Sequence, residues 1–521
     1  MIQLQHPFGK QYSNGVRVLV LGLGESGTAM VRWCHVQGAQ VSVADTRSSD
    51  QLSDTAKAYE QEVRELGINQ IHLGDLSADL LNDVAILAIS PGLSPIQEPV
   101  QSFLAFAAEK EIPVWSEIEF FAQALQALKE EQNYLAKVIA ITGTNGKTTT
   151  TALTGLLCER AGMSVGVAGN ISPAALDKLL DIEVLPQVWV LELSSFQLQH
   201  TYSLNPDAAT ILNITQDHFD WHGDIEHYLA AKARIFGQQT VAVLNRDDQL
   251  VSGLSDQLDV ARVVTFGVES PTEEDAFGIF HDTAAGGIDW LVWAEPDLEA
   301  LELKSKRRRK KVLDDDEPLR LKRLMPADAL RIKGRHNASN ALAAIAMTSA
   351  IGLPMGPLLH GLREYKGEPH RVQSISIIDG VEYIDDSKGT NVGATIAALV
   401  GLSESAGQQA RIVLIAGGEG KGQDFEPLQE AVAHHAKAVI LIGRDASKIR
   451  QALGSTRVQL MDADTLESAV DKAAQISTSG DMVLLSPACA SFDMFKDYAH
   501  RAAVFADAVN ELAISRGQVS A

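Results

Sequence analysis

The sequence predicts an α/β protein of three domains, and three observations lead to this prediction. The chain has 521 residues, enough for roughly three to four domains of ordinary size. Short apolar runs that suit buried parallel strands alternate with segments whose apolar residues recur at helical spacing. Glycine-punctuated turns follow two of these runs and lead into helices, as in doubly wound sheets. We place the domains at residues 1–134, 135–368 and 369–521.

Composition narrows the class of protein. The net charge of −23 argues against general binding to nucleic acid or to a membrane surface. The three cysteines are few and far apart, which suggests reduced thiols in a reducing compartment and no zinc site. No apolar run approaches the roughly 20 residues that span a bilayer, and residues 1–10 lack the apolar core of a signal peptide. We therefore expect a cytoplasmic protein that binds neither nucleic acid nor membranes. We also expect it to be a monomer.

The first domain opens with a strand, a glycine-rich turn and a helix. Residues 16–21 form an apolar run, and Gly22-Leu-Gly-Glu-Ser-Gly27 follows it. The next expected strand, 41–44, ends at Asp45, about 20 residues after the turn, as in dinucleotide-binding folds. The pattern predicts a Rossmann-like domain that could bind a diphosphate or a ribose hydroxyl. The alternative is that the glycines serve only the tight packing of helix against strand.

A second strand of this domain also ends in a polar segment. The apolar run 84–89 stops at Ser90-Pro-Gly92. This places the backbone of Ser90–Gly92 at the carboxyl edge of a parallel sheet, where the ligands of such sheets bind.

The central domain opens on the most informative stretch of the chain. The apolar run Val138–Ile141 leads into Thr142-Gly-Thr-Asn-Gly-Lys-Thr148, and a helical pattern follows. Backbone N–H groups of such a loop converge on phosphate oxygens, Lys147 would reach the β- and γ-phosphates, and Thr148 would bind Mg²⁺. The general pattern has glycine where Ile141 stands, so this loop is a shorter form. An ordinary strand-to-helix turn with a solvated lysine is the alternative.

Four further side chains of the central domain carry candidate chemistry. Glu192 ends an apolar run beside the phosphate loop, where a carboxylate suits Mg²⁺; a solvated loop residue is the alternative. His218 and His222 follow another apolar run, and either could bind a metal or act as an acid or base. The residues alone leave that choice open. Lys232 lies on a predicted helix and is plausible as a surface lysine.

The end of the central domain is less regular. Residues 270–333 include a basic run, 304–311, and an acidic run directly after it. Such blocks are usually solvated, so we predict an inserted surface loop over about 304–324; binding to an anionic partner is the alternative. Asn337 and Asn340 then share one helix face, where they could hold a nucleobase or ribose, or cap the helix.

The last domain repeats the alternation of strands and helices. A hairpin with an Asp379-Gly380 turn opens it, and four apolar runs follow, which predicts a second Rossmann-like domain. Polar groups at three strand ends could bind an anionic amino acid. They are Asp386, Ser387, Lys388, Thr390 and Asn391; Gly417-Gly-Glu-Gly-Lys421; and Ser486-Pro-Ala-Cys-Ala-Ser-Phe492.

Taken in order, these motifs resemble the Mur ligase family. The matching segments are Gly22–Gly27 with Asp45-Thr-Arg47, Thr142–Thr148, Glu192–Leu198, Asn213-x-Thr-x-Asp-His218, Gly334–Asn337, Asp386–Asn391, Gly417–Lys421 and Ser486–Asp493. The last four resemble the branch that adds D-glutamate. The resemblance covers nearly the whole chain apart from the insertion. Ala499-His-Arg-Ala-Ala503 departs from the branch, which usually carries Arg-Gly there.

The resemblance implies a role for each candidate residue. Catalytic roles would go to Lys147, His218 and Lys232. ATP would contact Gly143, Thr144, Asn145, Gly146, Lys147, Thr148, Thr149, Asn337, Asn340, Arg371, Asp386 and Lys388. A UDP-sugar would contact Ser26, Asp45, Thr46, Arg47, Gly92, Asn170 and His218. D-glutamate would contact Thr390, Lys421, Ser491 and Phe492. Magnesium, at two sites, would be held by Thr148, Glu192, His218 and a carbamylated Lys232.

The resemblance also implies a reaction. The chain would use ATP and Mg²⁺ to add D-glutamate to UDP-N-acetylmuramoyl-L-alanine through an acyl phosphate, in the cytoplasmic synthesis of peptidoglycan precursors. A nucleotide-binding dehydrogenase, based on Gly22–Gly27 and Asp45, is one rival, but it leaves the phosphate loop and Glu192 unexplained. A non-enzymatic scaffold that uses the basic run 304–311 is a second rival.

Overall fold

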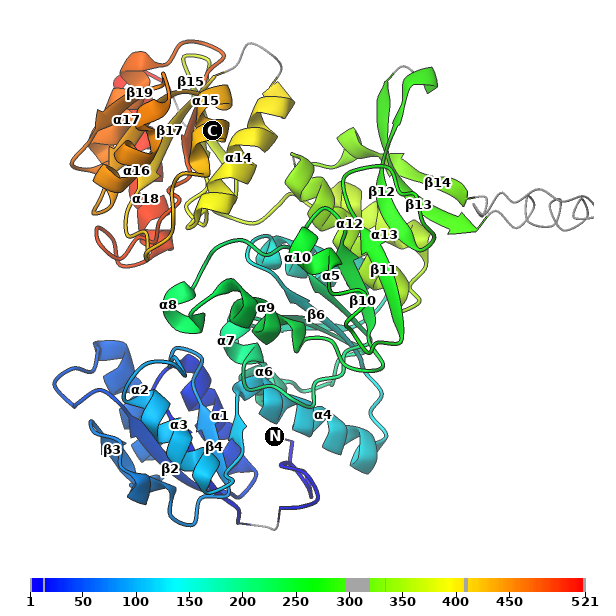
Figure 1. The fold of residues 1–521 in the computed structure, drawn as a ribbon, viewed down its shortest axis with the longest axis vertical. Helices are drawn as coiled ribbons and strands as arrows, with labels where there is room; N and C mark the ends of the chain where they lie inside the picture. Colours follow the sequence, from blue (N-terminus) through cyan, green and yellow to red (C-terminus); the bar gives the residue numbers. More distant parts are fainter. Residues whose placement is uncertain are drawn as a thin grey trace, which may run out of the picture. The chain divides into compact units, whose positions relative to one another are not determined.

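The computed structural model describes residues 2–12, 15–285, 287–296, 319–332, 334–406 and 411–518. It contains three sheets, which Figure 1 shows in blue, in cyan to green, and in yellow to red. Contacts between residues group the chain into two compact units. The first unit is Met1–Ile214, Trp221–Ala327 and Ala341–Leu362, and the second unit is Thr215–Asp220, Asp328–Asn340 and Arg363–Ala521. The α/β class is confirmed, and the domain limits 134/135 and 368/369 stay predictions.

The first sheet has the parallel order β3-β2-β1-β4-β5 of a doubly wound fold. Val18 and Val20 of β1 belong to one core cluster, which also contains Phe120 of α4, while Leu19 and Leu21 belong to a second core cluster with residues of α3. This burial on both faces explains the unbroken apolar run in the sequence. The elements are β1 (Arg17–Leu21), α1 (Glu25–Val36), β2 (Gln40–Asp45), α2 (Asp54–Glu65), β3 (Ile71–Leu73), β4 (Ile86–Ile89), α3 (Val100–Glu109), β5 (Val114–Trp115) and α4 (Glu117–Gln132).

The central sheet has the order β14-β13-β12-β11-β10-β9-β6-β8-β7. The strands from β7 to β12 pair in parallel, and β12, β13 and β14 pair antiparallel. Its strands are β6 (Lys137–Thr142), β7 (Val165–Gly169), β8 (Val188–Glu192), β9 (Ala208–Ile211), β10 (Val241–Asn245), β11 (Arg262–Phe266), β12 (Ala276–Asp282), β13 (Ile288–Pro296) and β14 (Leu319–Pro326). The helices are α5 (Lys147–Arg160), α6 (Ala175–Asp181), α7 (Ser195–Leu198), α8 (Phe219–His222), α9 (Ile225–Ala233), α10 (Gln249–Ser252), α12 (Arg335–Ala350) and α13 (Met355–Glu364).

Two predictions about the end of this domain are wrong. Residues 270–333 include the three regular strands β12, β13 and β14. Residues 319–324, which we placed in the inserted loop, belong to β14, where Leu319 and Leu321 are half-buried and alternate with exposed Arg320 and Lys322. The basic run 304–311 and the acidic run after it lie outside the described residues.

The last sheet has the order β15-β16-β20-β17-β18-β19 and is parallel except for the hairpin β15–β16. Asp379 and Gly380 both have positive φ, 53° and 78°, which suits the predicted two-residue turn. The strands are β15 (Gln373–Ile378), β16 (Val381–Asp385), β17 (Ile412–Gly417), β18 (Ala436–Ile442), β19 (Gln459–Asp462) and β20 (Met482–Leu485). The helices are α14 (Val392–Ala406), α15 (Leu428–His435), α16 (Ala446–Ala452), α17 (Leu466–Ile476) and α18 (Tyr498–Ser515).

The order of this sheet places its switch point between β20 and β17. Consecutive strands run outward from β17 to β19, and the chain then returns to form β20 on the other side of β17. Ligands of doubly wound sheets bind at such a point, outside the carboxyl ends of the strands. The predicted Gly417–Lys421 and Ser486–Phe492 segments both start there.

Among the helices of the described ranges, none is long and apolar enough to span a bilayer.

Candidate active site

The phosphate loop has the predicted strand–turn–helix form. β6 ends at Thr142, and α5 starts at Lys147. Gly143 and Gly146 have φ values of 151° and 83°, a region that favours glycine. A Cβ atom on Gly143 would lie 2.9 Å from Leu212 Cβ, so this glycine is also needed for close packing. The loop therefore presents backbone at the N-terminus of a helix, where an anion is favoured.

Asn213, to which the sequence analysis gave no role, supports this loop. The Asn145 backbone N–H donates to Asn213 Oδ1 at 2.8 Å, and Asn213 Nδ2 donates to the Asn145 carbonyl at 3.1 Å. The Thr144 N–H also donates to the Asn213 carbonyl at 2.9 Å. Asn213 opens the Asn-x-Thr-x-Asp-His motif and follows β9, which pairs with β6. That pairing, absent from the linear pattern, brings the two segments together.

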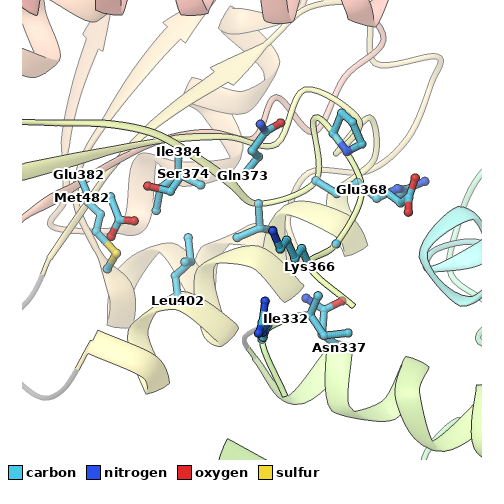
Figure 2. A pocket seen from close by; sticks show the side chains of 15 residues that line it. Ile332, Asn337, Lys366, Glu368, Gln373, Ser374, Glu382, Ile384, Leu402 and Met482 are labelled. Carbon is cyan, nitrogen blue, oxygen red and sulfur yellow. The ribbon is translucent and has the colours of Figure 1, made fainter. Parts of the chain in front are cut away.

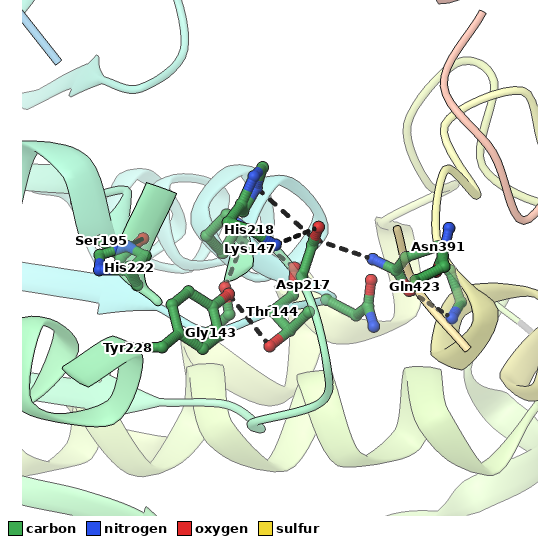
Figure 3. Close-up of polar contacts among 12 residues, drawn as sticks. Gly143, Thr144, Lys147, Ser195, Asp217, His218, His222, Tyr228, Asn391 and Gln423 are labelled. Atoms are coloured by element: carbon green, nitrogen blue, oxygen red, sulfur yellow. Dashed lines mark hydrogen bonds and ion pairs between the residues drawn. The ribbon is translucent and has the colours of Figure 1, made fainter. Parts of the chain in front are cut away.

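Lys147 is folded back over its own loop (Figure 3). Its Nζ donates to the carbonyls of Gly143 at 2.8 Å and Thr144 at 2.9 Å. The side chain of Lys147 is therefore held by the loop and does not extend into solvent. This does not support the alternative of an ordinary strand-to-helix turn with a solvated lysine. Its contact with phosphate stays a prediction, as do those of Thr148 and Thr149.

Glu192 is buried at the end of β8, with 2% of its surface exposed. Its Oε1 accepts a hydrogen bond from Asn170 Nδ2 at 3.1 Å, while its Oε2 is buried without a hydrogen-bond partner. A carboxylate oxygen left in this state is costly unless a cation binds it. The site therefore fits Mg²⁺, which prefers hard oxygen ligands, and the alternative of a solvated residue is wrong. Among the residues that the structure describes, no three His, Cys, Asp or Glu side chains gather so as to hold a metal ion.

Lys232 is not a surface residue. It is 1% exposed on α9, and its Nζ donates to the Gly143 carbonyl at 3.0 Å and to Thr142 Oγ1 at 3.2 Å. The same Nζ lies 4.6 Å from the centre of the Tyr228 ring. Lys232 thus contacts the phosphate loop directly, while its carbamylation stays a prediction.

The two histidines that the sequence left open have different environments. His222 is buried, and its Nε2 is hydrogen-bonded to Ser195 Oγ at 2.9 Å. His218 has a positive φ of 55° and lies 3.6 Å from the Asp217 carboxylate. Its segment, 215–220, groups with the second unit, where Asp217 Oδ2 accepts from Asn391 Nδ2 at 3.4 Å. The role of His218 as a metal ligand stays a prediction.

In the first domain, Asp45 and Arg47 form one hydrogen-bonded unit at the glycine-rich turn. Asp45 accepts from the Leu23 N–H at 2.7 Å and from Arg47 Nε and Nη2, both at 2.8 Å. Burial would raise the pKa of Asp45, but the bonds from Arg47 and Leu23 outweigh burial and lower that pKa. Asp45 therefore orients Arg47. A Cβ atom on Gly27 would lie 1.9 Å from the Gly22 carbonyl oxygen, so glycine is needed at this position for close packing. For Gly27 this agrees with the alternative that the glycines of the turn serve the packing of helix against strand.

The remaining candidates for the UDP-sugar are spread over two sheets of the first unit. Ser26 and Thr46 are partly exposed beside the turn, and Gly92 is exposed after β4. Asn170 is exposed after β7 and, as described, bonded to Glu192. Their contacts with a nucleotide sugar stay predictions.

The second unit holds a cavity of about 520 Å³ beside two of the predicted ATP residues (Figure 2). Asn337 and Arg371 line it, together with Lys366. Asn340 Nδ2 donates to Asn337 Oδ1 at 3.3 Å, so the two asparagines do share a helix face. Both lie inside α12 rather than at its first position, which argues against simple capping.

Asp386 and Lys388 lie on the loop after β16. Burial raises the pKa of Asp386 to about 7, although Ser486 Oγ donates to its Oδ2 at 2.7 Å. Lys388 Nζ lies 5.1 Å from the centre of the Tyr498 ring. Tyr498, the first residue of α18, carries no motif signal and was missed.

The D-glutamate candidates follow β16, β17 and β20. Ser491 is buried, Thr390 is partly exposed and Lys421 is exposed with a positive φ of 50°. Phe492 is 67% exposed, whereas the aromatic ring beside Lys388 is that of Tyr498. The four assignments stay predictions.

Arg501 joins the two loops that carry these candidates. It is fully buried and donates to the carbonyls of Ser387 at 2.8 Å and Cys489 at 3.1 Å. Burial lowers the pKa of Arg501 to about 10. Its segment, which departs from the branch pattern, forms a regular part of α18. The two buried backbone carbonyls that Arg501 bonds are the physical reason for an arginine here, and no linear pattern reveals them.

Comparison with known proteins places the chain. Three family models match it: the Mur ligase MurD-like N-terminal domain at 16–115, the Mur ligase middle domain at 141–348, and the Mur ligase glutamate ligase domain at 370–489. A UDP-N-acetylmuramoylalanine–D-glutamate ligase from Cupriavidus metallidurans is 56% identical over 509 residues, covering 96% of this chain and 98% of that protein. The ligase of the same name from Paraburkholderia xenovorans is 56% identical and covers 98% and 99%.

Solved structures with the same fold agree. The MurF ligase of Thermotoga maritima in complex with ADP aligns with a TM-score of 0.53 at 17% identity, over 98% of both chains. The MurC ligase of the same organism aligns with a TM-score of 0.51 at 18% identity, over 95% of this chain and 99% of that one. These likenesses concern the fold alone. From the matched domains and the curated relatives, the chain belongs to the Mur ligase family.

Proposed function

We propose that this protein is an ATP-dependent ligase that joins D-glutamate to UDP-N-acetylmuramoyl-L-alanine. The observation that carries the proposal is the 56% identity, over 96% of the chain, to a protein named for that activity. The geometry of the first unit supports it, because a phosphate loop, a buried carboxylate and a buried lysine lie together there. ATP, D-glutamate and the UDP-sugar would be the substrates.

The reaction has to activate a carboxylate. An oxygen of the alanyl carboxylate attacks the γ-phosphorus of ATP, and the bond from that phosphorus to the β,γ-bridging oxygen breaks. The products of this step are ADP and an acyl phosphate. The amine of D-glutamate then attacks the acyl carbon, phosphate leaves, and the nitrogen loses a proton to give the amide. No bond to the protein is needed, so the residues act by positioning and by electrostatics.

Lys147 would stabilise the first step. Its Nζ exchanges the carbonyls of Gly143 and Thr144 for oxygens of the β- and γ-phosphates, where negative charge develops. The N–H groups at the start of α5 bind the same phosphates. Asn337, Asn340, Arg371, Asp386 and Lys388 would hold the nucleoside.

Magnesium would be held by Thr148 and Glu192, and in our proposal also by His218 and a carbamylated Lys232, in two sites. When bound, Mg²⁺ supplies positive charge to the phosphate oxygens. The unpartnered Oε2 of Glu192 supports this assignment. Asn170 orients the other oxygen of the same carboxylate.

Substrate selection would fall to the two outer domains. Arg47, oriented by Asp45, offers a cation for the diphosphate of the UDP-sugar, with Ser26, Thr46, Gly92 and Asn170 around it. Thr390, Lys421, Ser491 and Phe492 would bind D-glutamate, Lys421 pairing with a carboxylate. The three cysteines are free and buried, which suits a reducing compartment, and we propose a cytoplasmic monomer in peptidoglycan precursor synthesis.

The test is phosphate release from ATP with UDP-N-acetylmuramoyl-L-alanine and one of four amino acids. D-glutamate should support release, and L-glutamate, meso-diaminopimelate and L-alanine should not. Release with another amino acid only would move the protein to a sister activity. No release with any of them, together with a fluorescence change on titration with NADH, would favour the dehydrogenase.

A further inference from the structure

We propose that His222 is a positioning residue for this ligase, which acts through Tyr228 on Lys232 and the phosphate loop. The inference rests on the proposed function. The mechanism above gives His222 no role, yet it is a polar side chain that is only 5% exposed. A buried imidazole costs free energy unless its nitrogens are bonded, and a phenylalanine would fill the space without that cost. What surrounds the ring suggests why a histidine is there.

His222 is anchored on one side to the segment after β8. Its Nε2 is hydrogen-bonded to Ser195 Oγ at 2.9 Å, and its ring stacks on Phe196 with 5.7 Å between ring centres. Ser195 follows Glu192, the proposed magnesium ligand, by three residues. Ser195 and Phe196 are the first two residues of α7, which begins with a capping box. The histidine is therefore fixed to α7, the short helix that follows Glu192 in the chain, and Figure 3 shows His222 beside Ser195.

A neighbouring contact fixes the backbone at the same point. Ser94 Oγ donates to the Trp221 carbonyl at 3.0 Å, and both residues are buried. The Trp221 ring packs on Phe196 with 4.6 Å between ring centres. The chain that enters His222 is thus tied to the loop after β4, which carries Gly92.

The ring of His222 also packs against Tyr228, with 5.2 Å between ring centres. Tyr228 is 2% exposed, and its hydroxyl lies 3.2 Å from Thr144 Oγ1 in the phosphate loop. Its ring lies 4.6 Å from Lys232 Nζ. One tyrosine therefore touches both the loop and the buried lysine, and His222 supports that tyrosine.

These contacts form a continuous path from Ser195 through His222 and Tyr228 to Lys232 and Thr144. Phosphoryl transfer depends on position, and a misplacement of about 1 Å can cost roughly 100-fold in rate. Removing the support under Tyr228 should let Tyr228, and with it Lys232, take more than one position. The effect should appear in the nucleotide and magnesium steps and not in the binding of D-glutamate.

The experiment compares wild-type enzyme with His222→Phe, which keeps a ring and loses the bond to Ser195, and with Ser195→Ala, which removes the other partner. We expect kcat to fall about 10- to 100-fold, as for residues that orient metal ligands. The Mg²⁺ concentration for half-maximal rate should rise, while KM for D-glutamate stays within about twofold of the wild-type value. The kcat of the double variant should be no lower than that of the poorer single variant, because both substitutions remove the same hydrogen bond between His222 and Ser195.

His227→Gln is the matched control. His227 lies in α9, the helix that carries Tyr228 and Lys232, but its side chain is exposed and bonded to Asp224, so its replacement should leave all these constants unchanged. Wild-type kcat and magnesium dependence in both single variants would overturn the proposal. So would an equal loss in every constant, KM for D-glutamate included, with a matching loss of thermal stability, because that pattern means a purely structural role.

A readout without turnover separates this inference from the proposed function. Calorimetric titration with Mg²⁺ and ADP should show weaker binding to His222→Phe than to wild type. If wild-type enzyme binds the nucleotide but releases no phosphate with D-glutamate, the proposed function fails while this comparison can still be made. Equal affinities in wild type and variant would again overturn the inference.

Discussion

Replacing Asn213 by alanine should weaken nucleotide binding about tenfold without unfolding the protein. The change removes two hydrogen bonds to the Asn145 backbone, at 2.8 and 3.1 Å, and leaves the bond from the Thr144 N–H to the carbonyl of residue 213. A net hydrogen bond contributes about 0.5–1.5 kcal/mol. Asn145 is partly exposed, so water can replace some of what is lost. We take about 1.4 kcal/mol for the pair, which corresponds to a factor of about ten in affinity.

The assay is calorimetric titration with ADP and Mg²⁺, with circular dichroism to follow thermal unfolding. Asn213→Asp should fall between wild type and alanine, because its carboxylate still accepts from the Asn145 N–H but cannot donate to the carbonyl. Asn69→Ala is the control, since Asn69 is an exposed asparagine of the first domain. Wild-type affinity in a folded Asn213→Ala protein would refute the claim that this side chain holds the loop in its binding form.

Three further predictions concern charge and burial. Glu192→Gln keeps an acceptor for Asn170 but loses the negative charge, so phosphate release at a fixed Mg²⁺ concentration should fall at least about 100-fold with little change in melting temperature; an active variant would exclude a metal role for Glu192. Arg501→Met removes two hydrogen bonds to buried carbonyls, and the free energy of unfolding in urea should fall by about 2 kcal/mol; an unchanged midpoint would contradict this. Burial raises the pKa of the Glu117 carboxyl from its ordinary value of 4.5 to about 7. Between these pH values the folded state holds a proton that the unfolded state has lost, so the free energy of unfolding should decrease as the pH rises from about 4.5 to about 7. Glu117→Gln should lose that part of the pH dependence, as melting curves at pH 5 and pH 8 would reveal.

Local sequence patterns were enough to predict the geometry of the phosphate loop. A buried strand, glycines at positive φ and a lysine at the start of a helix are neighbours in the chain, so their geometry follows from short-range sterics. The Asp379-Gly380 hairpin followed for the same reason. The two doubly wound sheets also followed, because apolar runs and helical spacing recur regularly along the chain.

Patterns failed where contacts are distant in sequence. Asn213 and Asn145 meet because β9 pairs with β6, and Arg501 finds its two carbonyls because β16 and β20 are neighbours. The strand β14 was missed because a half-buried antiparallel strand with charged residues outside resembles irregular chain.

By itself, the sequence determined the fold class, the phosphate loop, the order of the motifs and, through them, the family resemblance. Each of these depends on residues close together in the chain or on their order. Only the tertiary structure decided that Lys232 is buried against the loop, that one Glu192 oxygen lacks a donor, and that His222 belongs to a packed cluster. Burial and hydrogen-bond partners are properties of the three-dimensional neighbourhood, and a lysine or a histidine looks the same in the sequence whether it faces water or the core.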